Sequence, residues 1–372
     1  MAALKKNKIK KTSSKKAKKA KPRLKSVKRR PKIKSKKKVA SSRLIRSLSN
    51  PIIKPSHYPN WESQATFNPS AIYHGGKIHI VYRAIGAGDV STLGYAISDD
   101  GLTVSRRFPM PIYDHCLKKN KDEYVLQISS SGGGWNGGCE DPRLTLIGGR
   151  VYMIYTAFDG WGSVRVALSS ISLDDFISRR WNWKTPVLIS PPGEINKNWV
   201  LFPEKIGGKY AILHSISPEI MIAYFDSLDE LNGDTYIKSV NQDDPRWQLR
   251  SPGIRGAGPA PIKTKYGWLV LYHAMEKRDP NRYKLWAMIL DAKDPTKVLY
   301  RSSEPILEPD LWYENEGFKS GIVYSCGAVV KNGELFVYYG GADMVTCVAT
   351  ANLDAFLKDI ISGSASKLTP KI

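Results

Sequence analysis

The chain has 372 residues, of which 57 are Lys or Arg and 34 are Asp or Glu, giving a formal net charge of +23. Residues 1–46 hold 22 of the basic residues and no acidic one, and the other 35 basic and 34 acidic residues nearly balance. The sequence shows no run of eighteen apolar residues to span a membrane, and no apolar stretch accompanies the basic start as in a secretory signal.

Residues 1–47 are predicted to form a disordered basic arm, because Lys with Pro, Ser and Ala buries too little apolar surface to fold. The arm is either a solvated extension or a tether that binds polyanions non-specifically by counterion release. Residues 48–372 are predicted to form one large domain. Four widely spaced cysteines without a Cys-x-x-Cys pair indicate reduced thiols, no metal site and a cytoplasmic location; they are Cys116, Cys139, Cys326 and Cys347.

Five segments share one pattern, in which an apolar strand runs into a tight turn and out into an aromatic-rich strand. They are Asn68–Arg83, Asp141–Phe158, Phe202–Ser215, Gly258–Met275 and Ser325–Asp343. The second residue of each turn is expected to be a glycine, namely Gly76, Gly149, Gly208, Gly267 and Gly333. Successive glycines are 73, 59, 59 and 66 residues apart, which suits four strands with their loops. A repeat of this period predicts propeller blades.

A second, shorter apolar strand follows each hairpin and leads into an Asp-rich turn. These segments are Leu93–Ser98, Val164–Ser169, Ile220–Phe225, Lys284–Leu290 and Thr346–Ala351. Helical periodicity is nearly absent, and Leu353–Ile361 is the best candidate. The sequence therefore predicts an all-β fold, a five-bladed β-propeller in which Leu48–Phe67 closes the ring against the last blade.

Equivalent positions of the hairpins would bring polar side chains to one mouth of the central channel. Asn68 and Asp141 each lie eight residues before the hairpin glycine and precede a proline. The returning strands add Arg83, His214, His273 and Asp343. Taken singly, these residues have ordinary explanations, because Asp-Pro is a common turn dipeptide and a histidine that ends an apolar strand is more often structural. Their combination favours an active site.

Several motifs in series resemble glycoside hydrolase family 130, the β-mannoside phosphorylases with five-bladed propeller folds. The resemblance runs from Tyr58 to Leu357. It is carried by Gly138–Arg143 (GCEDPR), Asn196–Tyr210, Gly256–Thr264 (GAGPAPIKT), Tyr272-His273, Pro305–Pro309 (PILEP), Gly340–Asp343 (GGAD) and Val348–Leu353 (VATANL). The resemblance implies that inorganic phosphate, as co-substrate and without a cofactor, attacks a non-reducing-end β-mannoside with inversion and releases α-mannose 1-phosphate.

The resemblance also implies roles for individual residues. Asp141 matches the general acid, which is thought to pass its proton through the 3-hydroxyl of the sugar, and Glu140 is next in line. The positions that match mannoside binding are Asn68, Arg83, Glu140, His214 and Asp343. The positions that match phosphate binding are Arg165, Lys197, Arg255, His273 and Tyr283, where charge-assisted hydrogen bonds would hold the anion.

The resemblance leaves the linkage and the acceptor sugar of the substrate open. The main expectation is a β-1,4-mannooligosaccharide, with β-1,2-mannobiose or oligomannan as the alternative. Ser215 follows His214 where many members of the family carry an arginine, so a hydrolase of this family stays an alternative to a phosphorylase. A second alternative, which is not an enzyme, is a carbohydrate-binding propeller. The acceptor loops are expected at Lys118–Trp135 and Arg278–Tyr283. Homo-oligomerisation stays open.

Overall fold

The computed structural model describes residues 43–58, 60–113, 138–158, 164–240, 253–276 and 279–363. These residues form antiparallel sheets with few helices, so the predicted all-β class is confirmed. Residues 1–42 of the predicted arm and the predicted acceptor loop at Lys118–Trp135 lie outside the described residues. No helix in the described ranges combines the length and the apolar character needed to cross a membrane.

The strands follow one another in five groups along the chain. The first group contains β2 (Ala65–His74), β3 (Lys77–Ile85), β4 (Ser91–Ser98) and β5 (Arg106–Arg107), and the second contains β6 (Gly138–Ile147), β7 (Arg150–Phe158), β8 (Val164–Ser172) and β9 (Val187–Leu188). The third contains β10 (Val200–Leu201), β11 (Tyr210–Ser215) and β12 (Met221–Phe225). The fourth contains β13 (Ile254–Ala257), β14 (Ile262–Thr264), β15 (Gly267–Glu276), β16 (Asp279–Leu290) and β17 (Val298–Arg301). The fifth contains β18 (Val323–Lys331), β19 (Glu334–Gly341) and β20 (Val345–Asn352), with β1 (Ile45–Arg46) at its edge.

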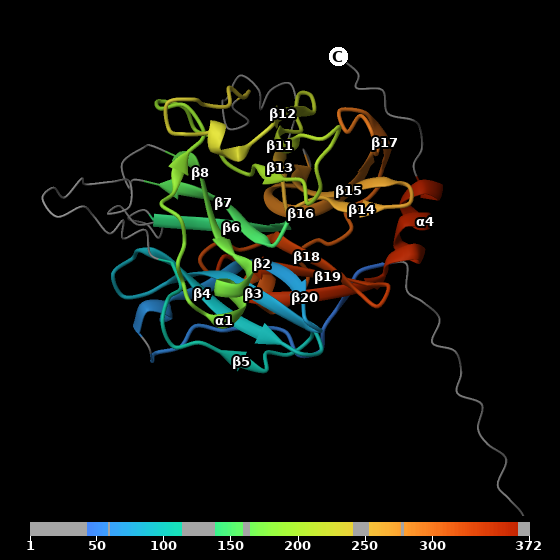
Figure 1. The fold of residues 1–372 in the computed structure, drawn as a ribbon. Helices are drawn as coiled ribbons and strands as arrows, with labels where there is room; N and C mark the ends of the chain where they lie inside the picture. The colour runs from blue at the N-terminus through green and yellow to red at the C-terminus, as the bar shows by residue number, and fades with distance from the viewer. Residues whose placement is uncertain are drawn as a thin grey trace, which may run out of the picture. The chain divides into compact units, whose positions relative to one another are not determined.

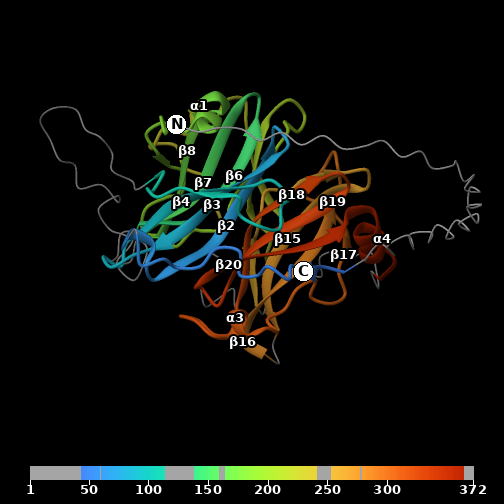
Figure 2. The same cartoon turned by 90° about the horizontal axis from the view of Figure 1, so that it is seen from below.

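The helices are short and lie outside the sheets. They are the α-helices α1 (Leu173–Ser178), α3 (Trp312–Asn315) and α4 (Leu353–Gly363) and the 3₁₀ turns η1 (Asn60–Glu62) and η3 (Leu228–Glu230). Helix α4 confirms the helix expected at Leu353–Ile361, and it packs against β17 and β20 (Figure 2). Helix α1 stands where an Asp-rich turn was expected after Val164–Ser169. The Ser172 side chain caps the first turn of the helix by accepting from the Asp175 amide.

Four sheets, rather than five separate ones, hold these groups. The first and second groups share one eight-stranded sheet, although only the parallel pair Ser91 and Gly138 joins them. Four of the five predicted turn glycines occupy the second turn position with positive φ. The fifth prediction is wrong, since Lys265 and Tyr266 form that turn and Gly267 already begins β15. A Cβ on Gly267 would lie 2.0 Å from the Leu290 carbonyl oxygen, so close backbone contact requires glycine there.

Five buried apolar clusters lie between consecutive groups. Each cluster takes side chains from two neighbouring groups, for example Leu144 with Leu93 and Phe202 with Trp268. One of the five joins the last group to the first, where Val329 and Phe336 of the fifth group pack with the first. Figure 1 shows β2 between β6 and β18, and both strands contact it. The core is therefore divided among the interfaces between groups.

Residues 45–53, at the start of the described part of the chain, pair with the fifth group. Ile45 and Arg46 pair with β20, and Ile53 forms an isolated bridge with Thr346. Ile45 and Arg46, which the sequence analysis placed at the end of the arm, therefore belong to a sheet in the structure. The Arg46 guanidinium donates to both carboxylate oxygens of fully buried Glu314 at 2.7 and 2.9 Å, which fastens this segment.

Two truncations test this boundary. We expect removal of residues 1–47 to lower the free energy of unfolding by about 3 kcal/mol relative to removal of residues 1–42. The longer deletion takes away Arg46 and leaves the Glu314 carboxylate buried without its cation. Denaturant unfolding of the two proteins measures the difference. Equal stabilities would show that the β1 segment contributes nothing to the domain.

Candidate active site

The first strands of the first and second groups carry β-bulges at matching positions. The register shifts between Phe67 and Ser70 on β2 and between Glu140 and Arg143 on β6. Asn68 and Asp141 lie in these bulges with left-handed φ angles of 47° and 53°. A bulge redirects a side chain, and left-handed backbone at a non-glycine residue persists only where its surroundings enforce it. The equivalence predicted for Asn68 and Asp141 is thus a shared backbone feature.

Asp141 is held by two donors that bind the same oxygen. The Asn68 Nδ2 donates to Asp141 Oδ1 at 2.7 Å, and Arg83 Nη1 donates to the same atom at 3.3 Å. Both of these hydrogen bonds from described residues go to Oδ1 and neither of them goes to the other oxygen, Oδ2. The Asp141 residue is only 8% exposed. The carboxyl is therefore fixed at one oxygen and available for a further contact at the other.

Arg83 joins the two neighbouring carboxylates. Its Nη2 donates to Glu140 Oε1 at 3.0 Å, and its Nε donates to Ser91 Oγ at 2.8 Å. The guanidinium also lies 4.7 Å from the centre of the Phe67 ring. Burial alone would lower the pKa of Arg83, but Glu140 and Asp141 raise it above its ordinary value. Arg83 is thus a buried, permanently charged clamp.

The carboxyl groups of this cluster differ in acidity. Burial favours the neutral form of Asp141, yet Arg83, Arg143 and the hydrogen bond from Asn68 lower its pKa below the ordinary value. Burial dominates at Glu140, whose pKa is raised although Arg83 partly offsets the effect. Two adjacent carboxyls with pKa values moved in opposite directions are typical of acid–base sites.

Asp343 belongs to the same cluster through its charge. Burial raises its pKa, and Lys319, whose Nζ lies 3.2 Å from Asp343 Oδ2, and Arg83 work against the rise. Its backbone is left-handed with φ 51°. A Cβ on Gly340, on the preceding strand, would lie 2.3 Å from the Asn68 Oδ1, so the fifth group meets the first closely here.

Arg143 connects Asp141 to the far side of the site. Its guanidinium donates to the Asp141 carbonyl at 2.8 Å, to Asn198 Oδ1 at 2.8 Å and to the Tyr324 hydroxyl at 3.1 Å. Its acceptors include the Gly258 carbonyl but no side-chain carboxylate among the described residues. The arginine braces the bulge of β6.

Three of the predicted phosphate-binding residues gather around Tyr324. The His273 ring stacks on the Tyr324 ring with centroids 4.0 Å apart, and Arg255 lies 5.8 Å from the centre of the Tyr283 ring. The rings of Tyr283 and Tyr324 lie 6.3 Å apart. Burial and Arg143 lower the pKa of His273 to about 3, so the imidazole is neutral and its Nε2 accepts from the Ser325 amide. Lys197 acts on Glu140, where its charge offsets part of the rise in pKa that burial causes.

His214 and Arg165 have partners outside this cluster. His214 Nδ1 pairs with Ser239 Oγ at 2.9 Å, and its ring packs edge-on against Trp199. Burial lowers the pKa of His214 to about 4. Arg165 donates to the Ser190 carbonyl and lies 5.1 Å from the Tyr236 ring centre. Among the described residues, the interactions found for His214 and Arg165 are with residues outside the Asp141 cluster. Of the six residues expected to converge, Asn68, Arg83, Asp141, Asp343 and His273 interact with one another through hydrogen bonds or charge.

Four residues of this region were missed by the sequence interpretation. They are Ser91, Asn198, Lys319 and Tyr324. Tyr324 had a usable signal, because it lies beside the bulge of β18 and one residue before Ser325, which is at the level of Asn68 in the first hairpin. The other three lie outside the repeated hairpins and carry no such signal. Within the described ranges, no three His, Cys, Asp or Glu side chains are grouped to hold a metal ion.

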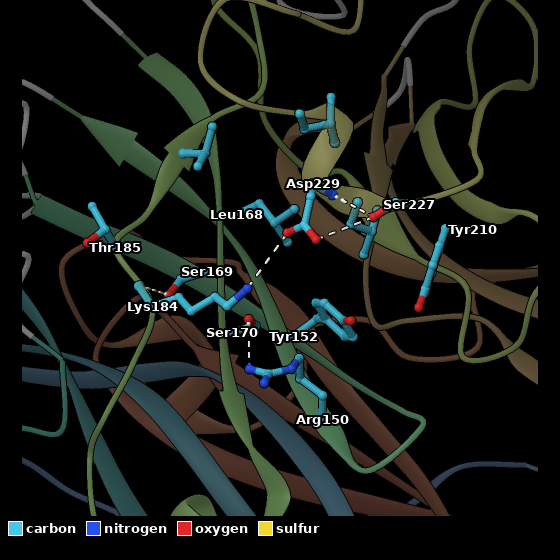
Figure 3. A pocket seen from close by; sticks show the side chains of 13 residues that line it. Arg150, Tyr152, Leu168, Ser169, Ser170, Lys184, Thr185, Tyr210, Ser227 and Asp229 are labelled. Atoms are coloured by element: carbon cyan, nitrogen blue, oxygen red, sulfur yellow. Dashed lines mark hydrogen bonds and ion pairs between the residues drawn. The ribbon is translucent and has the colours of Figure 1, made fainter.

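A cavity of about 190 Å³ lies away from the Asp141 cluster. Figure 3 shows it between strands β7 and β8 and the η3 turn, with Tyr152, Ser170 and Asp229 on its walls. Its ion pair of Lys184 with Asp229 spans 3.7 Å between side chains that are 58% and 88% exposed. Such a pair is solvated and weak. The buried, paired carboxyls of the Asp141 cluster are the better candidates for chemistry.

Comparison with known proteins identifies relatives over most of the chain. A family model, Glyco_hydro_130, described as beta-1,4-mannooligosaccharide phosphorylase, matches residues 26–361. A 1,2-beta-oligomannan phosphorylase of Thermoanaerobacter sp. (strain X514) is 40% identical over 82% of this chain and 96% of its own length. A beta-1,2-mannobiose phosphorylase of the same strain is 38% identical over 81% of this chain and 94% of its own length. The solved beta-1,2-mannobiose phosphorylase of Listeria innocua, in complex with beta-1,2-mannobiose, is 25% identical with a TM-score of 0.62, over 85% of this chain and 99% of that one.

Proposed function

This chain belongs to glycoside hydrolase family 130, and we propose that within this family it is an inverting β-mannoside phosphorylase. The observation that carries the proposal is the clamped carboxyl of Asp141. Asn68 and Arg83 fix one of its oxygens and leave the other available to a substrate hydroxyl. A buried acid held in this way suits proton transfer to a leaving group.

The proposed reaction exchanges one bond for another at the anomeric carbon of the terminal mannosyl residue. An oxygen of inorganic phosphate attacks this carbon, and the bond from the carbon to the acceptor oxygen breaks. The acceptor oxygen takes up a proton that originates from Asp141 and passes through the sugar's 3-hydroxyl, and the product is α-mannose 1-phosphate. Phosphate is already an anionic nucleophile, so one acid and a cationic site replace the acid and base of an inverting hydrolase.

The pKa of Asp141 is lowered in the free site and rises when the substrates bind. In the free site its lowered pKa makes it a carboxylate at neutral pH. A sugar that displaces water from this carboxyl and a phosphate anion placed nearby both raise a carboxyl pKa. The loaded site therefore favours the protonated form that a general acid needs, and Arg83 and Asn68 keep the group in position.

We assign the phosphate to the side of the site where Arg255, His273 and Tyr283 gather around Tyr324, with Lys197 beside Glu140. Replacing Lys197 by Ala is expected to raise the phosphate KM about tenfold or more and to change the mannoside KM by less than about threefold, because this cation would touch only the nucleophile. Initial rates at varied phosphate and fixed mannoside measure the effect. Equal changes in the two KM values would remove Lys197 from the phosphate site.

We propose β-1,2-linked mannosides as the substrate. The two relatives at 40% and 38% identity, each matched over more than nine-tenths of its length, are both named for β-1,2 linkages. Their names support this linkage over the β-1,4 linkage that the sequence analysis expected and that the family model's description carries. Phosphorolysis of β-1,2-mannobiose and β-1,4-mannobiose in parallel tests the choice. A higher kcat/KM for the β-1,4 disaccharide would reverse it.

We further propose that the five strand groups are the blades of a propeller. The support is the set of apolar clusters between consecutive groups, one of which joins the fifth group to the first. The pairing of β1 with β20 adds a strand from the chain start to the last blade. This arrangement explains why bulges on different groups bring Asn68 and Asp141 together.

A further inference from the structure

An exposed segment lies directly on the residues that flank Asp343. The segment is residues 316–320, between α3 and β18, and all five of its residues are exposed. A Cβ on Gly317 would lie 2.4 Å from the Ala342 carbonyl oxygen, so the backbone of Gly317 is in contact with Ala342. The Lys319 amide donates to the same carbonyl at 3.1 Å. Phe318, between these two anchors, is therefore held next to the Asp343 region.

Burial decreases from the acid outward to this segment. Asn68 and Asp141 are 3% and 8% exposed as residues, whereas the side chain of Asp343 is 14% exposed and that of Lys319 is 57% exposed. Lys319 reaches inward with Nζ 3.2 Å from Asp343, and its charge also acts on Glu140. The segment thus forms the solvent side of the carboxyl cluster.

The apolar ring of Phe318 is partly exposed to water, which is unfavourable for an apolar side chain. Its residue is 42% exposed. An exposed aromatic ring beside a polar site is typical of a ligand contact. Aromatic rings suit the apolar CH face of a pyranose, and their rigidity keeps the entropic cost of ordering low.

An enzyme that acts on a terminal residue must let the rest of its substrate leave toward solvent. If the mannosyl ring contacts Asn68, Arg83 and Asp343, the leaving sugar has to pass the solvent side of Asp343. Resting on the proposed function, we propose that residues 316–320 form the acceptor site, with the Phe318 ring against the leaving sugar and Lys319 orienting Asp343. This site is additional to the acceptor loop expected at Arg278–Tyr283.

Reverse synthesis separates the acceptor from the donor. With α-mannose 1-phosphate as donor and mannose as acceptor, we expect Phe318→Leu to raise the acceptor KM about tenfold. The KM for mannose 1-phosphate should stay within about twofold, because the donor lies deeper in the site. Phe318→Tyr keeps the ring and should restore the acceptor KM, which a loss of general packing would not allow.

The matched control is Tyr224→Leu, at an aromatic residue of β12 with 40% exposure that the proposal leaves outside the site. This variant should have wild-type constants for both substrates. An active wild type in which Phe318→Leu behaves like Tyr224→Leu would overturn the acceptor site and leave the proposed function standing. A wild type that makes no product from mannose 1-phosphate and any tested mannoside acceptor would overturn both. Equal rises in the donor and acceptor KM values would place Phe318 at the mannosyl ring instead.

Discussion

Replacing Asp141 by Asn is expected to reduce phosphorolysis by about a hundred- to ten-thousand-fold, the range for loss of a general acid. An amide keeps an acceptor oxygen for Asn68 and Arg83, whose donors reach Asp141 Oδ1 at 2.7 and 3.3 Å. It cannot release a proton at neutral pH. The fold and mannoside binding should therefore survive while turnover is lost, which single-turnover kinetics and a binding titration measure separately.

The neighbouring carboxyl provides the control for this experiment. Glu140→Gln leaves Asp141 in place and removes only the negative charge beside Arg83, because the amide oxygen can still accept from Arg83, so a smaller loss is expected. If Asp141→Asn kept more than about a tenth of wild-type activity, Asp141 would not be the acid. A larger loss in Glu140→Gln than in Asp141→Asn would assign the proton to Glu140, whose raised pKa makes it the more easily protonated of the two in the free site.

Replacing Arg83 by Ala is expected to lower the free energy of unfolding by about 3–5 kcal/mol at neutral pH, because it leaves two largely buried carboxylates without their shared cation. Activity should fall with it. The two ion pairs span 3.0 and 3.3 Å, and Arg83 is 9% exposed, so solvent cannot replace the guanidinium easily. Denaturant unfolding of the variant and the wild type gives the difference.

Arg180→Ala is the matched control, because Arg180 forms a 2.7 Å ion pair with Asp175 but is 58% exposed. Little or no loss of stability is expected there. The Arg83 effect should also depend on pH. The pKa of Asp141 is lowered in the folded protein, so the stability that Arg83 provides through it is present above the ordinary carboxyl pKa and disappears as the pH falls through the folded value. Equal losses in Arg83→Ala and Arg180→Ala would contradict the clamp.

The repeat in the sequence predicted the centre of this site because the bulges recur at one level of the hairpins. Counting back from a glycine found Asn68 and Asp141 since the strands between them and the turn are regular. His214 was predicted from the returning strand, without this count. The register of β11 shifts between Leu213 and Ser215, so His214 is the irregular residue and its ring packs against Trp199 instead.

Other contacts in the structure could not be predicted from the sequence, because they depend on how distant segments pack. Arg165 lies on β8, two strands out from β6, where the nearest acceptor is the Ser190 carbonyl. Lys319 comes from a loop outside every repeat, and only the packing of Gly317 on Ala342 brings it to Asp343. The arm boundary was set by charge and composition, and neither reveals that Arg46 pairs with a buried glutamate.

The central claim is that phosphate, and not water, attacks the mannoside bound at the Asp141 cluster. It is tested most directly by incubating the protein with β-1,2-mannobiose in phosphate buffer and following the products by phosphorus and proton NMR. We predict one α-mannose 1-phosphate for each mannose released, a rate that rises with phosphate concentration, and no turnover without phosphate. Two mannose molecules per disaccharide with no phosphate consumed would contradict the account.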